Sequence, residues 1–208
     1  PGQRIIIPAV QEAVKAVTAR FTNAGQSCVN AKRFIVDAAV ADAFVEAFAA
    51  KASALILGDP MAEGTTLGPL ARANLRAAIA DQVERSIAAG ARPVIGGSMG
   101  EGPGFFYRPT ILDHVAPGMA AFDEETFGPA AAIIRARDTE EAVALANRTA
   151  FGLGASIWTC DTQRGLDLAR RIDAGAVFVN AMVASDPRVP FGGIKASGYG
   201  RELGDLGV

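Results

Sequence analysis

Histidine and cysteine are scarce in this chain, and their scarcity excludes several kinds of site. The 208 residues contain one histidine, His114, and two cysteines, Cys28 and Cys160. A Ser-His-Asp or Cys-His hydrolase would therefore depend on His114 alone. The two cysteines lie far apart in the sequence, with no C-x-x-C pair and no second histidine, so these residues do not supply the ligands of a structural zinc site. We expect no metal.

An excess of charge of one sign is also missing, which argues against a nucleic-acid partner. The chain has 20 basic and 22 acidic residues, and its arginines are scattered rather than clustered. No uncharged apolar stretch approaches the roughly 18 residues of a membrane-spanning helix. The N-terminus, Pro1-Gly2-Gln3-Arg4, lacks the basic and apolar regions of an export signal. We therefore expect a soluble cytoplasmic protein with free thiols, which binds neither nucleic acid nor membrane.

The glycine-rich loops that hold phosphates in nucleotide-binding folds are absent as well. The segment 100–104 is the nearest match to G-x-G-x-x-G, but its spacing is wrong and it contains Pro103. We expect no complete dinucleotide-binding fold in these residues. The segment 25–29 is similar to a nucleophile elbow around Ser27, but Val29 stands where that elbow requires glycine. A serine hydrolase is therefore not supported.

What the chain does contain is an alternation of short apolar runs with stretches of helical periodicity. Half of its residues are apolar and one fifth are charged, which is typical of a globular protein, and its length suits one large domain. The periodicity predicts helices over 9–22, 44–55, 69–90, 139–147 and 161–171, and strands over 33–36, 93–95, 110–112, 130–134, 156–158 and 176–179. Beyond Phe191 the density of glycine indicates no regular element. The alternation predicts an α/β domain with an open, mostly parallel sheet and helices on both faces.

Cys28 is the strongest chemical candidate in the sequence. It follows Asn23-Ala24-Gly25-Gln26, a turn whose backbone amides can stabilise a thiolate or an adjacent oxyanion. Free cysteine also commonly fills a core, so these residues alone leave a structural role open. Cys160, between Trp158 and a polar segment, is assigned to the core or to the surface without a chemical role.

Three segments of the chain together match the motifs of a known family. Residues 21–28, F-T-N-A-G-Q-S-C, resemble the catalytic-cysteine segment of the aldehyde dehydrogenase superfamily. Residues 124–129, E-E-T-F-G-P, are similar to its E-x-F-G-P cofactor motif. Asn180 with residues 190–202 resembles its P-F-G-G-x-K-x-S-G-x-G-R-E signature. The three occur in family order, and residues 184–190 most resemble the NAD(P)-dependent succinate-semialdehyde dehydrogenases.

The resemblance implies a role for each matched residue. Cys28 would be the nucleophile, since a thiolate adds to an aldehyde carbonyl and gives a thiohemiacetal that NAD or NADP can oxidise to a thioester, from which water releases the acid. Glu125 would hydrogen-bond the nicotinamide ribose, and Phe127 would lie against the nicotinamide ring. Without the resemblance, Glu125 would be interpreted as a surface carboxylate. Glu124 is interpreted as a surface carboxylate in either case.

The residues assigned to the substrate depend on the resemblance too. Phe191 and Ser185 would line the aldehyde channel, although Phe191 by itself reads as a core aromatic. The carboxylate of succinic semialdehyde could be bound by Arg188 or by the Ser185 hydroxyl through charge-assisted hydrogen bonds. A number of enzymes of the kind that this chain resembles carry arginine at the position that Thr22 occupies. A generic aliphatic or aromatic aldehyde therefore stays open as the substrate.

The chain departs from the family pattern at both ends. The family's general-base glutamate, in an E-L-G-G-type segment, its oxyanion asparagine and its coenzyme-binding half lie farther upstream of the cysteine than the residues present. The end at 206–208 stops short of the last strand, by which family members join their neighbours. We therefore expect residues 1–208 to be the catalytic domain of a longer, homo-oligomeric aldehyde dehydrogenase, inactive as a dehydrogenase alone.

Two other functions stay open for these residues. A nucleophilic cysteine without a hydride acceptor could still hydrolyse activated esters, which would make the chain a weak thiol-dependent acyl hydrolase. Exposed sheet edges could instead make it a non-catalytic module that binds partner subunits.

Overall fold

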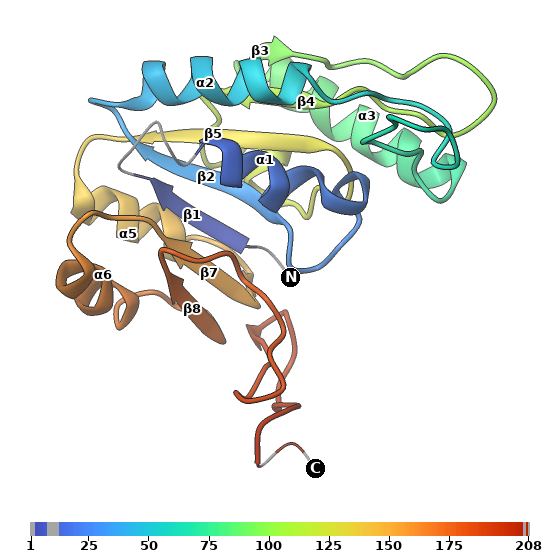
Figure 1. Ribbon diagram of the computed structural model, residues 1–208. Helices are drawn as coiled ribbons and strands as arrows, with labels where there is room; N and C mark the ends of the chain where they lie inside the picture. The colour runs from blue at the N-terminus through green and yellow to red at the C-terminus, as the bar shows by residue number, and fades with distance from the viewer. Residues whose placement is uncertain (1–2, 8–12, 206, 208) are drawn as a thin grey trace.

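The centre of the protein is a seven-stranded sheet in the order β3-β4-β5-β2-β1-β7-β8 (Figure 1). The structure is a computed structural model that describes residues 3–7, 13–205 and 207. The strands of the sheet are β1 (Gln3–Ile7), β2 (Ala31–Asp37), β3 (Arg92–Ile95), β4 (Thr110–Asp113), β5 (Ala130–Ala136), β7 (Gly154–Ile157) and β8 (Ala176–Val179). Neighbouring strands pair in parallel except β3 and β4, which are antiparallel. The predicted open, mostly parallel α/β sheet is confirmed.

The helices fill the connections between these strands. They are α1 (Ala13–Phe21), the 3-10 helix η2 (Thr22–Gly25), α2 (Ala41–Ser53), α3 (Ala73–Ala88), α4 (Ala120–Asp123), α5 (Thr139–Asn147) and α6 (Thr162–Ala169). Helix α2 packs against β2 and β3, α5 against β2 and β5, and α6 against β7 and β8. In Figure 1, α2 lies near the top of the molecule, and α5 and α6 lie at its left. None of the helices within the described ranges is long and apolar enough to span a lipid bilayer.

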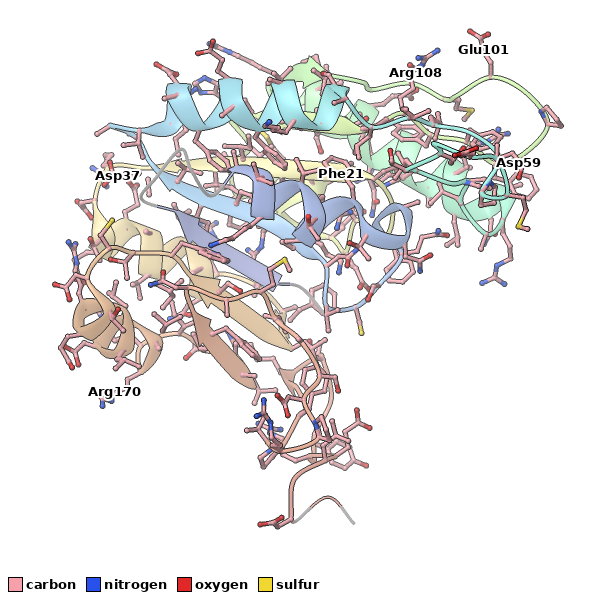
Figure 2. The ribbon with its side chains drawn as sticks, in the orientation of Figure 1. Phe21, Asp37, Asp59, Glu101, Arg108 and Arg170 are labelled. Atoms are coloured by element: carbon pink, nitrogen blue, oxygen red, sulfur yellow. The ribbon has the colours of Figure 1, made fainter. Side chains whose placement is uncertain are left out.

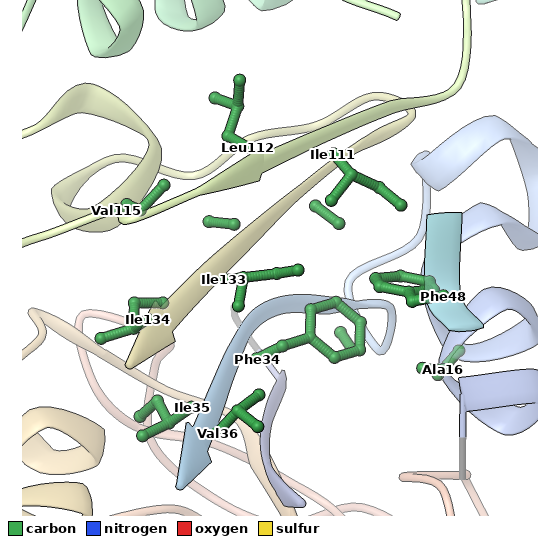
Figure 3. Packing of buried hydrophobic residues seen from close by; sticks show 14 of the residues in the cluster. Ala16, Phe34, Ile35, Val36, Phe48, Ile111, Leu112, Val115, Ile133 and Ile134 are labelled. Atoms are coloured by element: carbon green, nitrogen blue, oxygen red, sulfur yellow. The ribbon is translucent and has the colours of Figure 1, made fainter. Parts of the chain in front are cut away.

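The side chains of β2 show how the two faces of the sheet are covered. The ring centroid of Phe34 lies 5.0 Å from that of Phe48 in α2, and Phe48 lies 6.1 Å from Phe21 of α1. The guanidinium of the preceding residue, Arg33, lies 4.9 Å from the ring of Phe122 in α4. Since successive side chains of a strand point to opposite faces, α1 and α2 cover one face and α4 the other. Figure 2 shows Phe21 inside the molecule, and Figure 3 shows Phe34 and Phe48 in one buried cluster.

Two predicted elements have the bounds that the sequence indicated. Helix α5 spans Thr139–Asn147, and the carboxylate of Asp138 caps it by accepting a 2.8 Å hydrogen bond from the Glu141 amide. Strand β8 spans Ala176–Val179. Local signals, an N-cap with an acidic first turn and a short apolar run, are sufficient in both places.

The predicted helix over 69–90 is wrong at its first turn. Helix α3 begins at Ala73, because the Leu70 amide donates a 2.9 Å hydrogen bond to the Phe105 carbonyl instead of entering the helix. The predicted helix over 9–22 corresponds to α1, with residues 9–12 outside the described ranges. Its described part ends at Phe21.

The expectation of no regular element after Phe191 is also corrected. Strand β9 (Ile194–Lys195) pairs antiparallel with β6 (Phe151–Gly152), and neither strand was predicted. Phe191 and Glu202 exchange two backbone hydrogen bonds of 2.7 and 2.8 Å. The glycines in this segment allow two stretches of chain to approach closely. The partner of β9 is β6, which lies far earlier in the sequence. A local pattern does not reveal such a pairing.

Candidate active site

The chain enters the site through a sharp reversal after α1. Asn23, Ala24 and Gly25 have φ angles of 53°, 51° and 74°, the left-handed region that side chains other than glycine avoid. Gly25 packs directly on the backbone of Gly128, and a Cβ at Gly25 would collide with the Gly128 carbonyl oxygen. The first and second family-like segments therefore touch, backbone to backbone, and only glycine fits at this contact.

Cys28 lies in the turn that follows, which we call the Cys28 turn (residues 23–30). The Asn30 amide donates a 3.1 Å hydrogen bond to the Ser27 carbonyl and closes the turn around Cys28. The Asn30 side chain donates to the carbonyl of Thr22 at 2.7 Å, which fixes the turn to the end of α1. The Cys28 side chain is exposed, so it does not fill the core. Cys160 is exposed as well and lies at the surface, one of the two places predicted for it.

Arg20 joins α1 to the segment that contains the E-x-F-G-P motif. Its fully buried guanidinium donates to the carbonyls of Ala31 at 3.3 Å, Thr126 at 2.8 Å and Gly128. Burial lowers the pKa of Arg20 to about 9, an effect that the charge of Glu125 partly opposes. One buried cation thus holds three separate backbone segments together.

Lys32, at the start of β2, makes a second connection between the same segments. Its side chain is 4% exposed, and its Nζ lies 3.5 Å from Glu125 Oε1 and 3.4 Å from the Ser27 carbonyl oxygen. The ammonium also lies 5.8 Å from the centroid of the Phe127 ring. Burial lowers the pKa of Lys32 to about 8, helped by the charge of Arg20 and opposed by Glu125 and Cys28. The fold therefore brings the Cys28 turn, Glu125 and Phe127 to one place.

The Glu125 carboxylate has one oxygen that accepts no hydrogen bond from the described residues. Its Oε1 atom is buried and accepts no hydrogen bond of normal geometry from the described residues, although Lys32 lies close. Its backbone carbonyl accepts a 3.1 Å hydrogen bond from Gln82, which fixes the segment. The Glu125 carboxylate and the Phe127 ring both lie close to the Lys32 ammonium, and a carboxylate with an apolar ring suits the ribose hydroxyls and nicotinamide ring of a dinucleotide. Glu124 is instead occupied by Arg85, with bonds of 2.7 and 2.9 Å, as befits a surface carboxylate.

Phe191 reaches the site through a small apolar cluster. It is buried with Leu153 and Val183, and Val29, the residue after Cys28, packs against the same cluster. The backbone pairing of Phe191 with Glu202 fixes this position. The third family-like segment is therefore anchored next to the Cys28 turn, as the predicted role of Phe191 requires.

The other residues assigned to the substrate are exposed and have local partners. Arg188 is bonded to Asp186 at 2.9 and 2.6 Å, and these bonds lower the pKa of Asp186 to about 2. The Thr22 hydroxyl donates to the Thr18 carbonyl at 2.7 Å. Ser185 lies in the same exposed loop as Arg188. Among the described residues no hydrogen bond or ion pair connects these side chains to Cys28, so their roles stay predictions.

The sequence did not lead us to Arg20 and Lys32. Both are buried cations, and Lys32 lies in β2, whose residues are buried as far as Val36. A buried charge requires a partner, which was a usable signal, but the identity of the partner depends on segments about a hundred residues away. No group of three or more metal-ligating side chains occurs in the described ranges.

Comparisons with known proteins agree with this geometry. Residues 8–208 match the sequence model of the aldehyde dehydrogenase family. Over 197 residues the chain is 50% identical to succinate semialdehyde dehydrogenase [NAD(P)+] of Escherichia coli, covering 94% of this chain and 43% of that protein. The crystal structure of succinic semialdehyde dehydrogenase from Streptococcus pyogenes, in complex with NADP+, superposes with a TM-score of 0.94 at 37% identity, over 99% of this chain and 46% of that one.

A third relative contains the other coenzyme. The Mycobacterium tuberculosis aldehyde dehydrogenase complexed with NAD+ superposes with a TM-score of 0.93 at 36% identity, over 99% of this chain and 44% of that one. The predicted resemblance is confirmed. The chain spans less than half the length of the relatives it matches.

Proposed function

The chain belongs to the aldehyde dehydrogenase family, and on that premise we propose that residues 1–208 form the catalytic domain of an NAD(P)-dependent aldehyde dehydrogenase. The observation that carries the proposal is the junction of the Cys28 turn with Glu125 and Phe127 through buried Lys32. The exposed Cys28 thiol could bind the aldehyde, and the Glu125 carboxylate keeps an acceptor that could bind the coenzyme, which would accept the hydride.

Cys28 carries the covalent chemistry in this proposal. Its sulfur adds to the aldehyde carbonyl carbon, the carbonyl oxygen takes a proton, and a thiohemiacetal forms. The short turn that holds the thiol is fixed at both ends, by Asn30 on α1 and by Gly25 on Gly128. A fixed nucleophile loses little freedom when the substrate binds, which favours the addition step.

Glu125 and Phe127 would hold the coenzyme. The carboxylate would accept hydrogen bonds from ribose hydroxyls, and the Phe127 ring, two positions away in the sequence, would offer an apolar face. Bound NAD or NADP supplies the acceptor for the hydride that leaves the thiohemiacetal carbon. Gln82 keeps the Glu125 backbone in place and Lys32 holds its carboxylate, so this chain orients the acceptor rather than supplying the redox chemistry.

Succinic semialdehyde is the substrate that we propose. The relatives from Escherichia coli and Streptococcus pyogenes bear this activity in their names. In this chain Phe191 would contact the aldehyde, Ser185 would line the channel, and Arg188 would bind the distal carboxylate through a charge-assisted hydrogen bond. Thr22, the first residue of η2, completes the proposed set. An uncharged aldehyde would gain nothing from Arg188, which makes the two substrates distinguishable.

The experiment compares two thiol variants of the whole protein that contains these residues. Wild type should reduce NAD or NADP when succinic semialdehyde is added. Cys28→Ser should abolish this activity, while Cys160→Ser, which removes the other exposed thiol, should retain it. Persistent aldehyde oxidation by Cys28→Ser would refute the assignment of the nucleophile.

A second arm uses the 208-residue chain itself. These residues match under half the length of their relatives. We therefore propose that iodoacetamide alkylates Cys28 in the 208-residue chain, but that this chain alone does not reduce NAD or NADP. Positioning of the coenzyme against the reacting carbon can supply roughly 7 to 11 kcal/mol of the barrier, and Glu125 with Phe127 makes only part of a dinucleotide site. Robust coenzyme reduction by the 208 residues would overturn this part of the proposal.

A further inference from the structure

Lys32 joins the two parts of the proposed site, and its contacts indicate a role of its own in the chemistry. Its ammonium approaches the carbonyl of Ser27, the residue before Cys28, at 3.4 Å, and the carboxylate of Glu125 at 3.5 Å. The same ammonium faces the Phe127 ring at 5.8 Å. One side chain therefore contacts both the turn that presents the thiol and the segment assigned to the coenzyme.

The burial of Lys32 makes a purely structural role a poor explanation. Only 4% of the side chain is exposed, and the desolvation of an ammonium opposes folding unless its partners compensate fully. Glu125 is its single carboxylate partner among the described residues, and Arg20 adds a second buried positive charge nearby. An apolar side chain of similar length would fill the same space without that desolvation.

Three ionisable groups face the Lys32 ammonium, and together they limit the interactions that it can make. Arg20 faces it from α1, Glu125 from the segment before β5, and Cys28 from the turn before β2. Arg20 has its own carbonyl partners, so the Lys32 ammonium is the cation shared between the Cys28 turn and Glu125. Ser27 directly precedes Cys28, so the ammonium at 3.4 Å from the Ser27 carbonyl brings a positive charge close to the turn that presents the exposed thiol.

We propose that Lys32 is a positioning residue of this site: its buried ammonium binds the Cys28 turn and the Glu125 carboxylate together, and it supplies positive charge beside the Cys28 thiolate. The thiol and the coenzyme-contacting carboxylate are thereby held at a fixed separation. This inference rests on the proposed function for the roles of Cys28 and Glu125, but its main test requires neither coenzyme nor aldehyde.

The test compares two alkylating reagents on the 208-residue chain. Iodoacetate is an anion and iodoacetamide is neutral, and both react with the thiolate, so the ratio of their rate constants cancels the thiolate fraction and reports the local charge. Peptide mapping gives this ratio separately for Cys28 and Cys160. We expect Lys32→Met to lower the ratio at Cys28 roughly four-fold, the effect of one unit charge about 5 Å away in a solvated site. Lys32→Arg should restore the ratio, and Cys160 should be unaffected by either change.

A pH profile of the wild-type chain tests the same charge without a variant. The Lys32 pKa of about 8 means that the ammonium loses its proton as the pH rises through that value. The iodoacetate-to-iodoacetamide ratio at Cys28 should therefore fall across this range, while the ratio at Cys160 stays flat. This measurement decides the matter even where Lys32→Met fails to fold. A flat ratio at Cys28, or an equal change at both thiols, would overturn the proposal.

The link to Glu125 is measured in the whole protein. Lys32→Met should raise KM for NAD or NADP about ten-fold with a smaller change in kcat, because the residue orients a coenzyme contact. Combining it with Glu125→Gln should add little beyond either single change, since both break one connection. Strict additivity would refute that connection. If the wild-type enzyme shows no dehydrogenase activity, the proposed function fails, while the alkylation ratio still decides the role of Lys32.

Discussion

The Cys28 turn and the loop of residues 184–189, which we call the Arg188 loop, are held in different ways. Arg20, Lys32 and Gly25 tie the Cys28 turn to residues 125–128, about a hundred positions away in the sequence. In the Arg188 loop the charged contact is local, the solvent-exposed pair Arg188 and Asp186, and the Gly204 amide adds a 3.1 Å hydrogen bond to the Pro187 carbonyl. Surface ion pairs of that kind contribute little to stability, whereas buried cations with several partners are costly to disrupt.

This difference indicates a division of labour within the site. The segments that hold the proposed nucleophile and coenzyme contacts are joined by buried groups, so a small displacement there would alter the proposed chemistry. The loop that holds the proposed substrate contacts is exposed, so its side chains can change with less effect on the fold. Changes in the two regions should therefore have different consequences, and four experiments can break or sharpen that comparison.

The largest expected difference in stability between the two regions is that between Arg20→Met and Arg188→Met. Arg20→Met leaves the buried carbonyls of Thr126 and Ala31 without a donor and should lower the free energy of unfolding by about 3 to 4 kcal/mol. Arg188→Met removes an exposed pair and should leave the denaturation midpoint unchanged within error. Urea denaturation of both variants gives the comparison. Equal midpoints would show that the Cys28 turn is not held as described.

Glycine substitutions should give the next largest difference. Gly25→Ala introduces a Cβ against the Gly128 carbonyl at a φ of +74° and should destabilise the protein by about 2 to 3 kcal/mol. Gly198→Ala, in the C-terminal segment, also has a positive φ of +106°, but no atom lies within 4 Å of its added Cβ. Backbone strain alone should then cost about 1 kcal/mol. A thermal melt of each variant separates steric collision from strain, and similar losses in the two would argue against the close backbone contact.

The next largest effect should be the contribution of Lys32 to the pH dependence of the free energy of unfolding. Burial lowers its pKa from 10.5 to about 8, so the unfolded chain binds more protons between these values. The free energy of unfolding should then rise with pH across this window in wild type relative to Lys32→Met, by on the order of 1 to 2 kcal/mol. Parallel curves for the two proteins from pH 8 to 10.5 would contradict a buried, protonated Lys32. Asp186→Asn in the Arg188 loop should not change the alkaline curve.

The smallest effect should appear in substrate selection. In the whole protein, Arg188→Ala should lower kcat/KM for succinic semialdehyde about five-fold while leaving butanal, an uncharged aldehyde of equal length, unchanged. Arg188→Lys should retain part of the preference, because a point charge replaces the planar fork. A wild-type enzyme that oxidises the two aldehydes equally well would remove Arg188 as a carboxylate anchor.

Local signals explain why much of the fold was predictable. Helix α5 has an N-cap and an acidic first turn within its own residues, and β8 is a short apolar run. Their bounds follow from a few adjacent side chains. Strand β9 depends on β6, which lies far earlier in the chain, and Phe191 pairs with Glu202 only because the glycine-rich segment between them folds back, so periodicity gave no sign of either.

The candidate site shows the same limit more sharply. The family-like motifs led to Cys28, Glu125, Phe127 and Phe191, and the fold places these residues around one turn. The motifs say nothing of Arg20, because its partners are backbone carbonyls, which carry no sequence identity. They say nothing of Lys32 either, since a lysine in a strand acquires meaning only from what it faces.

The sequence by itself determined the type of sheet, the position of Cys28 in a turn and the family, because periodicity and motifs are properties of neighbouring residues. Only the tertiary structure decided which charges are buried beneath that turn. Whether an ammonium is desolvated and which carboxylate it meets depend on the approach of β2 and the segment before β5, through strands that pair in parallel across long connections. Desolvation is a property of the packed interior, and a linear sequence does not specify it until the chain has folded.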